Sequence, residues 1–243
     1  MSAAGKSRRS LLVATTSLGA GWILTGCATS SSERGKESEE KGRKEGKEEE
    51  EITPAEDLMR EHGILRRVLL VYEEAIRRLT AHQELPPQVL ASGAQIVRRF
   101  VEDYHERMEE DYLFPRFQKA GTLVELVTVL REQHEAGRKL TAEVLRLATP
   151  EGLRQPDSVA QLTNSLQRFI RMYQPHAARE DTVLFPALRK VVSPNEYDSL
   201  GEDFERKEHE LFGEDGFEKF VDEVAGLEKA LNLYELSSFT PRS

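Results

Sequence analysis

The sequence predicts an all-α protein, an antiparallel four-helix bundle built from two helix-pair repeats and followed by an extra C-terminal helical region. Apolar residues recur at steps of three and four along several stretches, which is the spacing of one helix face. A stretch near residue 105 is repeated near residue 176, and no strand-like alternation of any length interrupts the pattern. About fifty N-terminal residues of the 243 cannot belong to a globular core, so one domain of ordinary size remains.

Residues 1–27 are predicted to be a signal peptide. Arg8 and Arg9 precede an apolar stretch, Leu11 to Leu24, that is too short to span a bilayer comfortably. The stretch ends in Leu-Thr-Gly-Cys27, which resembles a bacterial lipobox and predicts lipidation of Cys27. The arginine pair resembles a Tat signal, although ordinary signal peptides also carry such pairs, so Tat and Sec export both stay open.

Residues 28–51 are predicted to be a disordered, charged linker. They are mostly Ser, Gly, Glu and Lys, and they cannot bury enough apolar surface to offset the entropy lost on ordering. With a lipid on Cys27, this segment would tether the folded domain to a membrane. We therefore expect an exported protein, anchored to a bacterial membrane and facing the periplasm or the cell exterior.

Residues 52–192 are predicted to form the bundle. Thr53-Pro54-Ala55-Glu56 has the pattern of a helix start with a capping box, and Pro86-Pro87 breaks the first helix. A second helix is expected to reach the Phe114-Pro115 region, a third to span about Thr122 to Leu147, and a fourth about Asp157 to Val191. The first and fourth helices each carry ionisable residues inside an apolar stripe, namely His62, His176 and Glu180.

Residues 193–243 are predicted to be a C-terminal helical extension. Ser193-Pro194-Asn195-Glu196 repeats the start signal found at Thr53, and a strongly charged helical region follows it.

An internal repeat of about 71 residues carries the functional prediction. The shared pattern is H-x-x-x-E-x-x-x-L-F-P, beginning at His105 and at His176. Leu-Met-Arg-Glu-His62 likewise resembles Val-Leu-Arg-Glu-Gln-His134. The chain therefore reads as two copies of one unit, in which one helix carries a single His and the next carries a His with a Glu four residues later.

This spacing indicates a metal site. Residues i and i+4 share a helix face, so His105 with Glu109, and His176 with Glu180, each direct an imidazole and a carboxylate to one point. Two buried glutamates would each cost several kcal/mol unless cations neutralised them. A lone core histidine or a solvent-facing helix pair is the common alternative for any one of these residues, but the repetition favours metal. Leu-Phe-Pro is better explained by core packing and helix termination.

Composition excludes other classes of site. The net charge of -9 and the interleaving of basic with acidic residues argue against nucleic-acid binding. Cys27 is the only cysteine, which leaves histidine and carboxylate as the metal ligands on offer. His82 lies beside a predicted turn and is expected at the surface. His209 lies outside the repeat, and we expect a structural role, with a supporting role near the site as the alternative.

About residues 54–190 resemble the hemerythrin-like family, also called the HHE cation-binding domain. The order of motifs looks most like the branch that includes a bacterial di-iron protein associated with repair of iron-sulfur clusters. The resemblance implies two non-haem iron ions, with manganese as an alternative. The ligands it implies are His62, His105, Glu109, His134, His176 and Glu180.

Two positions are compared with the oxygen-carrying hemerythrins, which belong to the family that this chain resembles. Those carriers have a further histidine where Arg138 stands here, which puts simple reversible oxygen carriage in doubt. They also use an aspartate at the position of Asp181, but repeat symmetry with Glu109 favours Glu180 as the ligand.

Three functions remain open from the sequence. The first is a di-iron protein that binds or senses dioxygen or nitric oxide at a membrane surface. The second is a di-iron oxidoreductase acting on nitric oxide, peroxide or oxygen, and the third is a metal store or structural metalloprotein. Since no cofactor-binding loop or electron-transfer domain is fused to the bundle, binding or sensing is favoured, and any redox partner is unknown.

Overall fold

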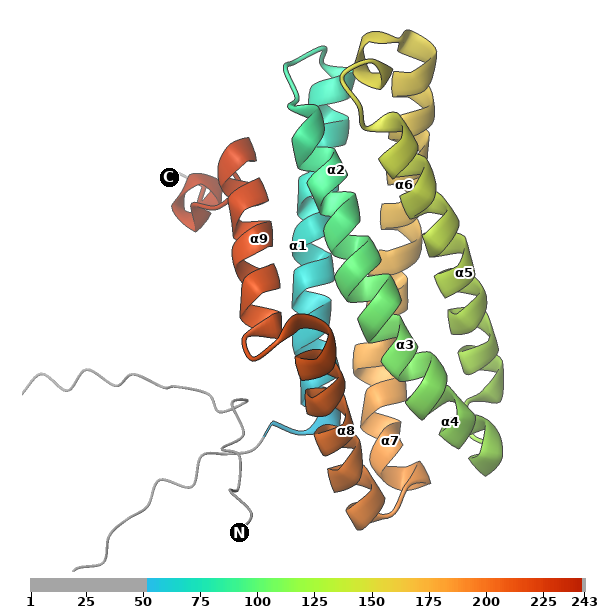
Figure 1. Ribbon diagram of the computed structural model, residues 1–243. Coiled ribbons are helices and arrows are strands. Elements are labelled where there is room, and N and C mark those ends of the chain that lie inside the picture. The colour runs from blue at the N-terminus through green and yellow to red at the C-terminus, as the bar shows by residue number, and fades with distance from the viewer. Residues whose placement is uncertain (1–51, 242–243) are drawn as a thin grey trace, which may run out of the picture. The chain divides into compact units, whose positions relative to one another are not determined.

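The computed structural model describes residues 52–241 and confirms the all-α class, with no strand in that range. Most of the range lies in α-helices, with three π-helical and two 3-10 segments between them (Figure 1). The elements are α1 Pro54–Thr80, α2 Pro87–Ile96, η1 Val97–His105, α3 Glu106–Met108, η2 Glu109–Leu113, α4 Phe114–Ala120, α5 Val124–Leu147, η3 Gly152–Arg154, α6 Pro156–Arg179, η4 Glu180–Leu184, α7 Phe185–Val191, α8 Pro194–Phe212, α9 Gly216–Leu231 and η5 Leu236–Phe239.

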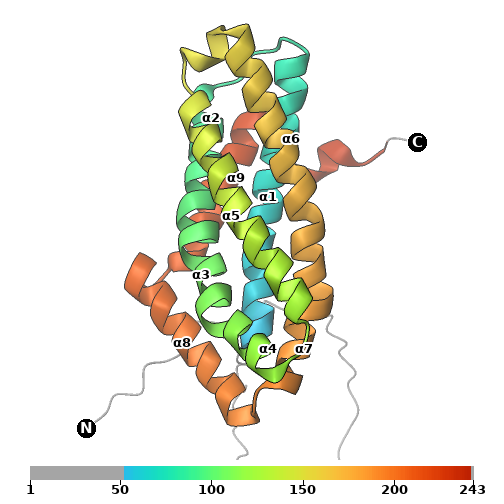
Figure 2. The same ribbon diagram turned by 90° about the vertical axis from the view of Figure 1, so that its right-hand side faces the viewer.

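Four helical rods form the bundle. They are α1, the continuous run from α2 to α4, α5, and the continuous run from α6 to α7. The rods lie side by side and alternate in chain direction (Figures 1 and 2). Their inward faces are apolar, and Leu58, Leu65, Leu166 and Phe169 are all at most 1% exposed. Burial of these stripes is the main stabilising term of such a bundle.

The predicted helix starts are present. The Glu56 amide donates to the Thr53 hydroxyl at 3.4 Å, and the Thr53 amide donates to the Glu56 carboxylate at 3.0 Å. This reciprocal pair is the capping box, and it satisfies two amides that no helical carbonyl can reach. At the start of α8 the Glu196 amide donates to the Ser193 hydroxyl at 3.3 Å.

The expected helix end at Phe114-Pro115 is wrong, because the rod continues through α4 to Ala120. A π-helical turn, η2, precedes Phe114 and places Pro115 in the first turn of a new α-helical segment. Proline is tolerated there because its missing N–H is not needed. The second copy repeats the arrangement, with η4 before Phe185 and Pro186.

The C-terminal helices α8 and α9 pack against the outside of the bundle. Contacts join α9 to α1 and α2, and α8 to α1 and α7. The Phe220 ring centroid lies 4.6 Å from that of Phe100 and 4.9 Å from that of Phe212, and Phe220 is 1% exposed. The guanidinium of Arg67 donates to both oxygens of Glu228, at 2.9 and 2.6 Å. An aromatic cluster and a bidentate ion pair therefore hold this region in place.

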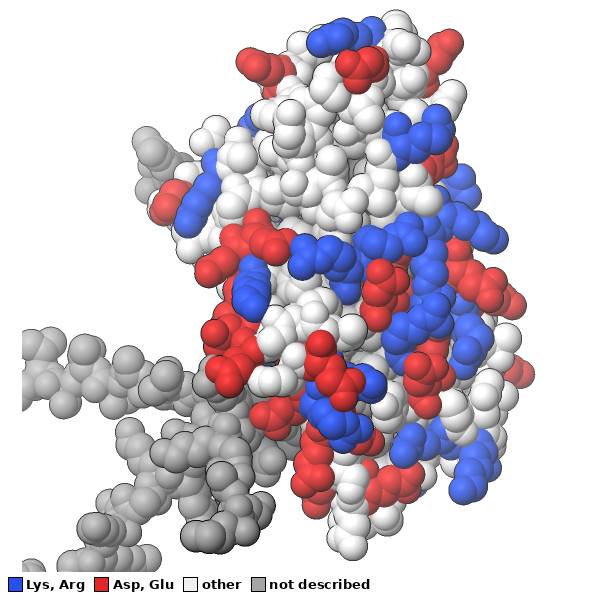
Figure 3. Space-filling view, in the orientation of Figure 1, with Lys and Arg blue, Asp and Glu red and all other residues white. Residues whose placement is uncertain are grey.

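The surface is charged with both signs. On the face shown in Figure 3, Lys and Arg side chains are interspersed with Asp and Glu. Within residues 52–241, no helix has the length and apolar character needed to cross a membrane. The predicted signal peptide, the lipidated Cys27 and the linker to residue 51 lie outside the described residues and stay predictions. The proposed domain boundaries also stay predictions.

Replacing Phe220 by alanine should lower the free energy of unfolding by about 3–5 kcal/mol, because a fully buried aromatic ring would leave a cavity under α9. Chemical denaturation measures the loss, and amide exchange should show faster opening of α8 and α9. Phe239→Ala is the matched control, since Phe239 is 59% exposed and should change stability by less than about 0.5 kcal/mol. Equal effects of the two variants would contradict the packing described here.

Candidate metal centre

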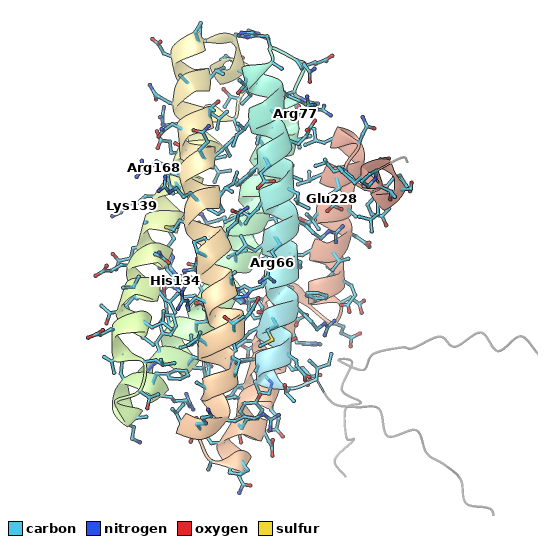
Figure 4. All side chains as sticks on the ribbon, turned by 180° about the vertical axis from the view of Figure 1, so that it is seen from behind. Arg66, Arg77, His134, Lys139, Arg168 and Glu228 are labelled. Carbon is cyan, nitrogen blue, oxygen red and sulfur yellow. The ribbon has the colours of Figure 1, made fainter. Side chains whose placement is uncertain are left out.

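The six residues predicted as ligands lie together inside the bundle. None of them is more than 4% exposed. Figure 4 shows His134 on α5 and Arg66, one turn after His62, on α1 at a similar level along the bundle. They come from all four rods: His62 from α1, His105 from the end of η1, Glu109 from the start of η2, His134 from α5, His176 from α6 and Glu180 from the start of η4.

Each buried glutamate reaches one histidine of each repeat. Glu180 Oε2 lies 3.3 Å from His62 Nε2 and 3.1 Å from His176 Nε2. Glu109 Oε2 lies 3.3 Å from His134 Nε2, and Glu109 Oε1 lies 3.8 Å from His105 Nε2. Both carboxylates therefore span the two halves of the centre, which is the arrangement that a pair of bridged metal ions requires.

The other ring nitrogen of each histidine is held by an oxygen acceptor. Nδ1 to oxygen distances are 2.7 Å for His62 to Asp181, 2.7 Å for His105 to Glu61, 3.0 Å for His134 to Glu110 and 2.8 Å for His176 to Gln133. Because an Nδ1–H that donates outward leaves the Nε2 lone pair free, each imidazole presents that lone pair to the centre. Metal-binding histidines are oriented in this way.

Sequence reasoning missed most of these acceptors, although the repeat contains them. Glu61 and Gln133 each precede the single histidine of their unit, while Glu110 and Asp181 each follow the buried glutamate. Asp181 hydrogen-bonds His62 and also pairs with Arg66, so it supports a histidine and does not line the centre. Aligning the residues next to each motif residue would have marked all four as candidates, but not which histidine each one contacts.

The oxygens of the two buried carboxylates accept no hydrogen bond within the part of the chain that the structure describes. Both oxygens of Glu109 and of Glu180, together with His134 Nε2, have no hydrogen-bond partner among the described residues. Orphaned acceptors at full burial are costly, and cations would satisfy all of them. The donor set of imidazole and carboxylate fits a pair of divalent or trivalent ions. One ion could be reached by Glu109, His134, His176 and Glu180, whose ligand atoms lie within 4.8 Å of one another. Another could be reached by His62, His105 and Glu109, which meet the same limit.

The pKa values of the two buried glutamates are shifted in opposite directions. Burial raises the pKa of Glu109 well above its ordinary value, and the charge of Glu180 reinforces the shift. Burial alone would raise the pKa of Glu180 as well, but the imidazoles of His176 and His62 hold it well below its ordinary value. Burial lowers the pKa of His134 to about 4, which favours the neutral imidazole that a metal binds.

Two phenylalanines of the repeated Leu-Phe-Pro cover the histidines. Phe114 stacks on His134 with ring centroids 5.5 Å apart, and Phe185 stacks on His62 at 5.4 Å. Each phenylalanine stacks on a histidine of the other repeat unit. The packing role expected for this motif is therefore present at Phe114 and Phe185, and these rings help to exclude water from the centre.

A polar cluster lies beside the half that contains His134 and His176. The Tyr173 hydroxyl donates to Glu106 at 2.6 Å, and Arg138 pairs with Glu106 at 2.9 Å and with Glu110 at 2.7 Å. A Cβ on Gly137 would lie 1.9 Å from the Tyr173 hydroxyl oxygen, so glycine is required for this close approach. Glu106, Glu110 and His134 also group as potential ligands, but the Arg138 guanidinium already supplies their cation.

The two remaining histidines of the described range are exposed. His82 follows α1 with a positive φ of 52°, and His209 lies on the outer face of α8. Neither belongs to the buried group.

A helical bundle with histidines and carboxylates buried at its centre is typical of a cation-binding protein. Its family is the Hemerythrin HHE cation binding domain family, whose sequence model matches residues 53–188, and the chain belongs to it. Two relatives are the uncharacterized proteins Rv1995 of Mycobacterium tuberculosis and Mb2018 of Mycobacterium bovis. Each is 46% identical over 240 residues, which covers 98% of this chain and 92% of the relative. No solved structure gives a significant match.

The metal-free protein should lose stability as the pH rises, partly through Glu106. Burial raises the pKa of this carboxyl to about 8 in the folded state, whereas an unfolded glutamate titrates near ~4.3. Between these values the unfolded chain releases the proton first, so the free energy of unfolding falls by at most about 1.4 kcal/mol per pH unit from this group. The stability that Glu106 contributes is fully present below the unfolded pKa of ~4.3, and it is lost as the pH rises toward the folded pKa of about 8.

Glu106→Gln should therefore flatten the pH dependence, with on the order of 1–3 kcal/mol less loss between about pH 5 and about pH 8. Denaturant titrations of both metal-free proteins measure the difference, and the glutamine amide oxygen can still accept from Tyr173. Identical pH profiles would show that Glu106 is already ionised in the folded state.

Proposed function

We propose that this protein is a non-haem di-iron protein that binds or senses dioxygen or nitric oxide at a membrane surface. The observation that carries the proposal is the position of Glu109 and Glu180, each within 3.8 Å of a histidine from both repeat units. His62 and His105 would hold one ion, and His134 and His176 the other, with the two carboxylates between them.

The number of donors supports an exogenous ligand. Four imidazole nitrogens and four carboxylate oxygens supply eight donors, whereas two octahedral ions need about twelve. Arg138 stands where oxygen-carrying relatives have a further histidine, and its guanidinium is already paired with Glu106 and Glu110. When bound, the iron pair would supply open coordination positions and one-electron redox chemistry. Iron suits this donor set better than tetrahedral zinc, and manganese is the alternative.

The protein would select its ligand by size and would hold the imidazoles in a fixed orientation. Because the centre is buried, with its histidines covered by Phe114 and Phe185, a small uncharged molecule is favoured over a bulky substrate. The outward hydrogen bonds keep all four imidazoles in one orientation before a ligand arrives. Dioxygen and nitric oxide both satisfy these limits.

A di-iron oxidoreductase acting on nitric oxide, peroxide or oxygen is the second candidate. The observation that favours it is Tyr173, whose ring lies 5.3 Å from that of His176 and whose hydroxyl donates to the buried Glu106. A phenol hydrogen-bonded to a carboxyl beside a redox centre is a group through which a proton can move.

Metal analysis of the purified protein should find about two irons per chain. His134→Ala and Glu180→Gln should each lose at least one, because each removes a buried donor that faces the centre. His82→Ala and His209→Ala are matched controls that should retain full iron, since both side chains are exposed. Full iron content in His134→Ala would contradict the ligand set.

Optical spectra of the reduced protein in air and with nitric oxide separate the candidates. A band that forms and reverses on removal of the gas supports binding or sensing. Irreversible oxidation with turnover supports the oxidoreductase, and bound metal that is inert to both gases would leave only a metal store or structural metalloprotein.

The membrane location rests on the N-terminal sequence. Cys27→Ala should move the protein from the membrane fraction to the soluble fraction of a bacterial host, because the lipid would be the anchor. Fractionation and mass spectrometry of the N-terminus measure both the shift and the lipid. An unchanged membrane fraction would show that Cys27 does not anchor the chain.

A further inference from the structure

The repeat provides an internal comparison of the two metal positions. Residues that correspond in the two units occupy equivalent places around the centre: Glu110 matches Asp181, and Arg66 matches Arg138. Each of these carboxylates accepts from a histidine and pairs with the matching arginine. The third pair differs, because Glu61 in the first unit corresponds to Gln133 in the second.

Glu61 and Gln133 make the same hydrogen bond with different charge. Glu61 Oε2 lies 2.7 Å from His105 Nδ1, and Gln133 Oε1 lies 2.8 Å from His176 Nδ1. Glutamate and glutamine have nearly the same shape. The half with His62 and His105 therefore has two carboxylate acceptors, while the half with His134 and His176 has one carboxylate and one neutral amide.

The charge of the hydrogen-bond acceptor changes how strongly the imidazole donates electrons to a metal. A carboxylate draws the Nδ1 proton more strongly than an amide oxygen does, which makes the ring a stronger electron donor through Nε2. A stronger donor favours the more oxidised ion and lowers its reduction potential.

We infer that the two iron positions are inequivalent: the ion between His62 and His105 stays oxidised to lower potentials, and the first electron goes to the ion between His134 and His176. This inference rests on the proposed di-iron centre. Glu61 and Gln133 act as positioning and tuning residues through the histidines they hold. The more easily reduced ion would then lie in the half next to Tyr173.

A potentiometric titration of the iron-loaded protein with a chemical reductant tests this directly. The wild type should show two one-electron steps. Glu61→Gln should raise the lower potential and leave the upper one in place, while Gln133→Glu should lower the upper potential and leave the lower one. An effect of about tenfold in the redox equilibrium corresponds to about 59 mV for one electron. Mössbauer spectra of the half-reduced protein should show one ferric and one ferrous ion.

The double variant Glu61→Gln with Gln133→Glu should reverse the assignment while keeping the total charge unchanged. Glu132→Gln is the charge control, since Glu132 is exposed on the same helix as Gln133 and should move neither potential by a comparable amount. A single two-electron step in the wild type, movement of the same potential by both single variants, or no movement at all would overturn the inference. Failure of the wild type to bind two irons would instead overturn the proposed function.

Discussion

Two carboxylates buried in the interior of an apolar bundle are the constraint on which the rest of the structure depends. Glu109 and Glu180 are both 0% exposed, and neither has a hydrogen-bond partner for either oxygen among residues 52–241. Such groups would destabilise the fold unless cations sat between them. The four histidines, their outward acceptors and the covering phenylalanines are all arranged around that requirement. The structure therefore gains its function from groups that would weaken it if they stood alone.

The helical rods and the gathering of the six side chains follow from local rules that the sequence displays. Steps of three and four place apolar residues on one face. A capping box begins a helix at Thr53, a serine N-cap begins one at Ser193, and the repeated H-x-x-x-E fixes which side chains share a face. The structure brings those six residues together, and metal ligation by them stays a prediction. What the sequence pattern could not show was the contact of Asp181 with His62 and of Glu110 with His134, because each crosses between rods that are far apart in the chain.

Pro115 does not end the helical rod, for a physical reason. A proline after an apolar helix normally indicates an end, but a π-helical turn before it can absorb the missing N–H and let the rod continue. These turns begin at the buried glutamates themselves, at Glu109 in η2 and Glu180 in η4. Two of the three π-helical segments in residues 52–241 thus begin where a carboxylate faces the centre, as is common for π-turns at functional sites.

The crossing of supports between the two units has a structural consequence. His62 takes its hydrogen-bond acceptor and its stacked ring, Asp181 and Phe185, from the second unit, and His134 takes Glu110 and Phe114 from the first. A chain with a single copy would leave its own single histidine without either support. A unit of this kind therefore needs a second unit beside it to support its single histidine. Because both units stand in one chain, corresponding positions can differ, as Glu61 and Gln133 do.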